Sequence, residues 1–144
     1  MKSVKYIIMA LTLMVATQVL ADGTQMADLN IIQGKQAELV IELSNADRNY
    51  VAFQLDLKLP EEVHVVSQSN GDPAISLSQD RSDGHLLSVS EISPGTYRLL
   101  AYSMSYKPFK DTSGPLVTVL LEAAQMSQAG SYTVTLTDQR FTDA

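Results

Sequence analysis

Cysteine is absent from this 144-residue chain, and its absence removes several kinds of chemistry at once. Without a thiol, the protein cannot use a cysteine nucleophile, a thiolate metal site or a disulfide bond. A single domain of this size needs no disulfide, because it buries roughly two thirds of its unfolded surface on folding. The missing cysteine does not identify a compartment, since an exported protein without cysteine is compatible with either redox state.

Catalytic motifs are also scarce. The sequence contains no glycine-rich phosphate loop and no serine placed between glycines in a nucleophile elbow. His64 and His85 both fall in strand-like stretches, where a histidine is typically a partly exposed pairing residue. Asp72, Asp80 and Asp83 could suggest calcium, but ordinary turn chemistry explains all of them. We therefore expect no catalytic residue, no metal and no cofactor.

Basic residues are in the minority, with 10 Lys and Arg against 16 Asp and Glu, for a formal charge of −6. Lys2 and Lys5 lie in the leader described next, so losing these two positive charges would take the formal charge from −6 to −8. An acidic domain repels phosphate backbones, which makes nucleic acid a poor partner.

Residues 1–21 have the pattern of a secretory signal peptide. A basic start precedes an apolar run over residues 6–15, and small residues at 19–21 form a plausible cleavage site. The run is shorter than the roughly 20 apolar residues that a membrane-spanning helix needs. We expect cleavage before Asp22, a mature domain over residues 22–144, and export to the periplasm, cell surface or extracellular space without membrane insertion.

Helical periodicity is nearly missing, and only residues 120–128 could hold a helical turn or two. Residues 51–60 instead alternate strictly, with the odd positions apolar and the even positions mostly polar until Pro60. Because side chains alternate between the faces of a strand, this pattern predicts one buried and one wet face. Such a strand needs a second layer over its apolar side, which favours a β-sandwich over a parallel α/β core.

Similar strand patterns recur at short spacing along the chain. They cover residues 27–33, 36–44, 63–68, 75–77, 85–92, 97–103, 116–122 and 132–137. We therefore predict an all-β domain of about eight or nine strands.

One of these strands has an unusual outward face. If Leu99 is in the core, then Arg98, Leu100 and Tyr102 point outward. Tyr and Arg are typical anchors of protein interfaces, so this face is a candidate binding surface. The alternative is that a loop covers it, for example through Phe109.

Four segments together resemble the cohesin family. They are VAFQLDLKLP at residues 51–60, YRLLAYS at 97–103, SGPLVTVLL at 113–121 and GSYTVTL at 130–136. More narrowly, the chain resembles the cohesin-like modules of exported Bacteroidetes proteins. The resemblance implies a jelly-roll β-sandwich that is related to carbohydrate-binding modules and is not catalytic.

Cohesins bind dockerins through one sheet face, so the resemblance also implies a site. Here that face would include Gln54, Asp56, Arg98, Leu100 and Tyr102. We expect a secreted or cell-surface binding module whose partner is a dockerin-like or other surface protein, or a polysaccharide. The alternative function is a structural spacer in a surface assembly, with no specific ligand.

Overall fold

The structure is a computed structural model that describes residues 10–15, 23–45, 48–125 and 127–144, with the backbone alone for residues 10–15. These residues form eleven strands and no helix. The strands are β1 (Ala10–Val15), β2 (Gly23–Met26), β3 (Leu29–Ile32), β4 (Gln36–Ser44), β5 (Tyr50–Lys58), β6 (Val63–Val65), β7 (Ile75–Leu77), β8 (Leu86–Ser93), β9 (Thr96–Tyr102), β10 (Pro115–Ala123) and β11 (Gly130–Asp143). Accordingly, the described part of the chain contains no helix that could span a membrane.

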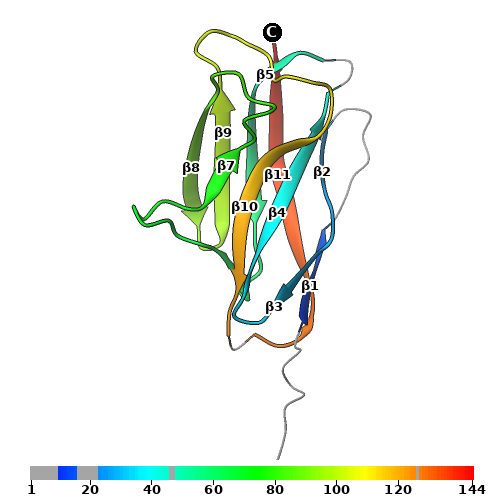
Figure 1. Ribbon diagram of the computed structural model, residues 1–144, viewed down its shortest axis with the longest axis vertical. Helices are drawn as coiled ribbons and strands as arrows, with labels where there is room; N and C mark the ends of the chain where they lie inside the picture. Colours follow the sequence, from blue (N-terminus) through cyan, green and yellow to red (C-terminus); the bar gives the residue numbers. More distant parts are fainter. Residues whose placement is uncertain (1–9, 16–22, 46–47, 126) are drawn as a thin grey trace, which may run out of the picture.

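Two sheets pack face to face, as Figure 1 shows. The first sheet has the order β3-β1-β11-β5-β9-β8, and the second has the order β2-β4-β10-β6, with β7 also paired to β10. Neighbouring strands are antiparallel except β1 and β11, which run parallel. The predicted all-β jelly-roll sandwich is therefore confirmed.

The alternating strand β5 supplies the centre of the core. Phe53 is 1% exposed, and Leu55 and Leu57 are completely buried beside it, as the alternation predicts. Leu99 and Ala101 of the neighbouring strand β9 are buried on the same side. The opposing layer comes largely from β4 and β10, which contribute further buried aliphatic side chains.

The strand boundaries differ from the predictions in a few places. The strand expected over residues 27–33 is the shorter β3, and β2 precedes it as a separate strand on the other sheet. Residues 120–123 continue strand β10 rather than forming a helical turn. His85 lies just before β8 instead of within it. The strand count rises to eleven because β1 and β2 add to those expected.

Strand β1 lies inside the predicted leader. Most of that leader, including its basic start and the cleavage site at residues 19–21, falls outside the described residues. Cleavage therefore stays a prediction, and β1 shows what Ala10–Val15 does when it remains attached.

Candidate functional site

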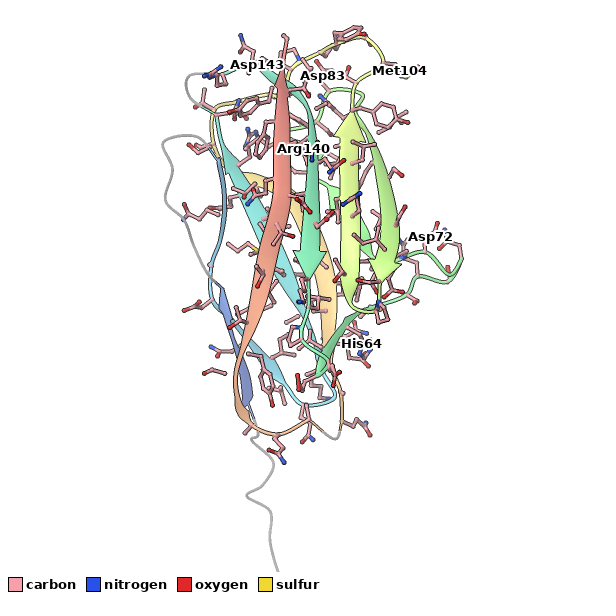
Figure 2. The ribbon with its side chains drawn as sticks, turned by 180° about the vertical axis from the view of Figure 1, so that it is seen from behind. His64, Asp72, Asp83, Met104, Arg140 and Asp143 are labelled. Atoms are coloured by element: carbon pink, nitrogen blue, oxygen red, sulfur yellow. The ribbon has the colours of Figure 1, made fainter. Side chains whose placement is uncertain are left out.

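The five residues singled out in the sequence lie together on the outer face of the first sheet. Figure 2 looks onto this face, with β11, β5, β9 and β8 side by side. Strands β5 and β9 are neighbours, and their register places Gln54 opposite Leu100 and Asp56 opposite Arg98. Tyr102 follows at the next outward position of β9. The arrangement is one contiguous patch, and its role in binding stays a prediction.

A bidentate ion pair holds the centre of this face. Arg98 donates from Nε and from one terminal nitrogen to the two carboxylate oxygens of Asp56, at 2.8 Å each. Asp56 is only 3% exposed, whereas the Arg98 side chain keeps 41% of its surface in contact with solvent. The Arg98 hydrogen bonds lower the pKa of Asp56 despite the opposing effect of burial, and the same bonds raise the pKa of Arg98.

Asp56 is included in the predicted binding face, but it is too buried to contact a partner directly. Instead it fixes the planar guanidinium of Arg98 in one orientation, because two hydrogen bonds to one carboxylate restrict the rotation of the Arg side chain. The solvent-exposed guanidinium of Arg98 is therefore held in a fixed orientation.

An apolar patch lies beside this ion pair. Leu100 is 40% exposed and Leu86 is 49% exposed, while Tyr102 is half-buried. Leu86 of β8 is directly opposite Tyr102 of β9, so the patch crosses two strands. Hydroxyl-bearing residues surround it, because Ser88 lies opposite Leu100 and Ser90 lies opposite Arg98.

Two members of this face were missed in the sequence, namely Leu86 and Arg140. The alternation within β8 could have identified Leu86 as outward, since Leu87 and Val89 pack against the core. The position of Arg140 on this face could not have been predicted from the sequence, because it depends on a break in the register of β11 between Thr137 and Arg140. Asp138 lies in that break with φ of 48°, a left-handed conformation that Asp tolerates better than most residues.

The alternative that Phe109 covers this face is wrong. Phe109 is 3% exposed and lies inside the sandwich, with its ring centroid 5.7 Å from that of Phe53 and 3.9 Å from that of His85. Buried Arg81 holds the surrounding loops by donating to the carbonyl oxygens of Leu43, Lys110 and Gly114 and to Asn45 Oδ1. The loop over residues 103–114, between β9 and β10, therefore closes one end of the sandwich and leaves the sheet face open.

The outer face of the second sheet has a different character. Glu38 and Glu42 of β4 and Glu122 of β10 are on this side, with no Lys or Arg at the described outward positions of these two strands. Glu122 accepts a hydrogen bond from Gln36 at Oε1, and its Oε2 lies 3.5 Å from Nε2 of His64. The charged side chains at the described outward positions of these two strands are therefore all acidic, next to uncharged ones such as Val40 and Leu120.

The histidine and carboxylate side chains give little support for acid–base catalysis. His85 accepts a hydrogen bond at Nδ1 from the backbone N–H of Asp83, and burial lowers its pKa, so the ring is kept neutral. Within the described residues, no group of three or more His, Asp and Glu could hold a metal ion.

A shallow cavity of about 500 Å³ lies between the edge strands β7 and β8. Its described lining includes Leu77, Leu87 and Val89 along with Gln68 and Ser76. No Tyr or Phe contributes to that lining, and its one aromatic ring is the imidazole of His85.

Comparison with known proteins finds no matching family model and no match among curated proteins. Similar solved structures are cohesins. The sixth cohesin of scaffoldin B from Acetivibrio cellulolyticus, solved with the Cel5 dockerin, has a TM-score of 0.62 at 13% identity, covering 77% of this chain and 78% of that one. CaCohA2 from Clostridium acetobutylicum has a TM-score of 0.64 at 10% identity, covering 93% and 79%.

A third similar structure comes from outside the bacteria. The non-cellulosomal cohesin of the archaeon Archaeoglobus fulgidus has a TM-score of 0.56 at 14% identity, covering 77% of this chain and 70% of that one. At such low identities the likeness establishes the fold alone. This chain has a cohesin-like β-sandwich fold.

Proposed function

We propose that this protein is a non-catalytic module that binds a protein partner through the outer face of β11, β5, β9 and β8. The observation that carries the proposal is the exposed patch of Leu86, Leu100 and Tyr102 beside the fixed guanidinium of Arg98. Tyr and Arg are enriched in interface hot spots, and the exposed Leu side chains beside them would add apolar area that a partner can bury.

The cohesin-like fold supports a protein as the partner. The Acetivibrio cellulolyticus cohesin named above was solved with a dockerin. Polysaccharide binding has less support, because no Tyr or Phe lines the cavity between β7 and β8 to stack on a sugar ring. A partner that fits the face would bring an apolar side chain to Leu100 and Tyr102, and acceptor or acidic groups to Arg98 and Arg140.

A matched pair of substitutions tests the face. Leu100→Asp places a charge in the proposed interface, whereas Leu120→Asp places the same charge on the outer side of β10 in the second sheet. Binding should be screened against dockerin modules, surface proteins of the source organism and a glycan array. We expect a protein ligand whose binding is lost in Leu100→Asp and kept in Leu120→Asp. Equal loss in both variants would refute the assignment, and the absence of any ligand would favour the spacer function.

We also propose that the protein is exported with cleavage near Asp22, because the leader has a basic start, a short apolar run and a small-residue end. Mass spectrometry of the exported protein should find an N-terminus near Asp22. An intact Met1 on exported protein would refute cleavage.

A further inference from the structure

The position of strand β1 has a consequence for the mature protein. In the first sheet β1 lies between β3 and β11, antiparallel to the former and parallel to the latter. Among the described residues, β3 forms its only ladder with β1. Residues 130–134 of β11 also pair with β1. Strand β5 does not pair with this part of β11, since its ladder with β11 begins only at Thr135.

Cleavage near Asp22 would remove this strand. It would leave both β3 and residues 130–134 without the strand that forms a ladder with them, along one shared gap. The side chains at its borders are part of the core, since Ile31 is 1% exposed and Val134 is completely buried. An open gap between two such strands is an unfavourable end state for the domain.

Neither border carries the devices that usually protect a free strand edge. The border segments read LNII at residues 29–32 and GSYTV at residues 130–134, so they contain no charged residue and no proline. Charged side chains and proline are what keep exposed edges from pairing with another chain. The two borders are therefore chemically suited to accept a strand.

We infer that the mature protein has a strand-acceptor slot between β3 and β11, which takes an extended apolar segment of another polypeptide. Ala10–Val15 shows the required ligand, because it runs parallel to β11 over a ladder from Leu11 to Val15. The register pairs Leu11 with Ile31, Leu13 with Tyr132, and Val15 with Val134.

These pairings predict the sequence that the slot accepts. The paired residues Ile31, Tyr132 and Val134 all pack in or against the core. Directly paired residues share one face of a sheet, so the ligand needs an aliphatic residue at every second position. The position between them is tolerant, because Thr12 is paired with the exposed residues Asn30 and Ser131. Backbone pairing would supply affinity and the alternate side chains specificity, as in other forms of strand addition.

The experiment starts from the full chain, so that folding does not depend on the gap. A protease site inserted between residues 16 and 22 is cut after purification, and size-exclusion chromatography with mass spectrometry asks whether the N-terminal fragment stays bound. A fluorescent peptide of residues 8–17, carrying a solubilising lysine tail, is then offered to the cut protein. Three variants of this peptide serve as comparisons, namely Thr12→Asp, Leu13→Asp and Leu13→Pro.

We expect the fragment to stay bound after cutting and to exchange with the wild-type peptide and with Thr12→Asp. Leu13→Asp and Leu13→Pro should bind at least about tenfold more weakly, the first because it puts a charge at the register position paired with Tyr132 and the second because it breaks the ladder. Equal binding of Leu13→Asp and Thr12→Asp would overturn the inference. A second result would also overturn it: the fragment is released, and the protein stays a monomer with an unchanged melting temperature. That result would mean that β3 closes onto β11. A stable dimer after release would show that a second copy fills the gap, which also overturns donation by another protein.

Discussion

The two outer faces of the sandwich are built on the same core, yet they differ in chemistry. On the second sheet Glu38, Glu42 and Glu122 give an acidic surface. On the first sheet the central carboxylate, Asp56, is neutralised by Arg98, and exposed Leu100 lies next to this pair. The outer face of the second sheet carries only acidic charges on β4 and β10, whereas the outer face of the first sheet is partly apolar, and its apolar part is what a partner could desolvate at low cost.

This contrast predicts that substitutions should separate into those that change folding and those that change binding. Neighbouring residues of β5 and β9 alternate between the core and the outer face, so positions one residue apart should have different effects. The predictions below test that separation, from the largest effect to the smallest.

Phe53→Ala should have the largest effect on stability. The ring is 1% exposed and lies close to the rings of Phe109 and Phe141, so its loss removes aromatic contacts from the centre of the core. We expect a loss of about 3–5 kcal/mol in the free energy of unfolding, the usual range for a buried aromatic truncation. Denaturant melts measure it. A loss below about 1 kcal/mol would mean that the core does not depend on this face of β5.

The same alternation explains how much the sequence could reveal. Residues 51–60 correctly predicted both the buried face of β5 and the outward positions of Gln54 and Asp56, because a period of two is a local property of the chain. The pairing of Leu86 with Tyr102 is between strands, and the position of Arg140 depends on the irregular register near Asp138. Neither follows from periodicity within one strand.

The leader shows another limit of pattern reading. An apolar run such as residues 10–15 suits a signal peptide and a buried strand equally well. Composition alone cannot decide between these two states.

Tyr102→Ala should mainly weaken binding. The side chain is half-buried at the surface between Leu86 and Leu100, where a partner could cover it. We expect affinity to fall by about 2 kcal/mol or more, or roughly 30-fold, as for a typical hot spot. Stability should fall much less than in Phe53→Ala. Titration calorimetry and melting temperature on the same variant decide the matter. A large stability loss with unchanged affinity would remove Tyr102 from the binding face.

The Asp56–Arg98 pair predicts a change in acid stability. Because the pKa of Asp56 is lower in the folded protein than in the unfolded chain, its stabilising effect is complete above the ordinary value of about 3.9. That effect is lost as the pH falls through the lower folded value. Asp56→Asn, which keeps the shape but not the charge, should therefore show a flatter decline in unfolding free energy below about pH 4. If the unfolding free energy of Asp56→Asn declined at low pH as steeply as that of the parent protein, other carboxylates would be the cause of the decline.

Arg140→Glu should have the smallest effect, and it should act on the rate of association. Arg140 lies opposite Gln54 at the edge of the proposed interface and is exposed, so it can attract acidic groups of a partner without being desolvated. We expect association to slow by up to about tenfold at low salt, with dissociation nearly unchanged, because a rim charge steers encounter more than it holds the complex.

Glu38→Arg is the matched control for this charge reversal, because Glu38 is exposed on the opposite sheet and the change has the same size with the opposite sign. If only the net charge of the domain mattered, Glu38→Arg would speed association as much as Arg140→Glu slows it. If the first sheet is the docking face, Glu38→Arg should change the rate by less than about twofold at 0.15 M salt, where screening acts over about 8 Å. Stopped-flow measurements across a salt series separate the two results. Equal and opposite effects of the two variants would show that the face around Arg140 has no special part in the encounter.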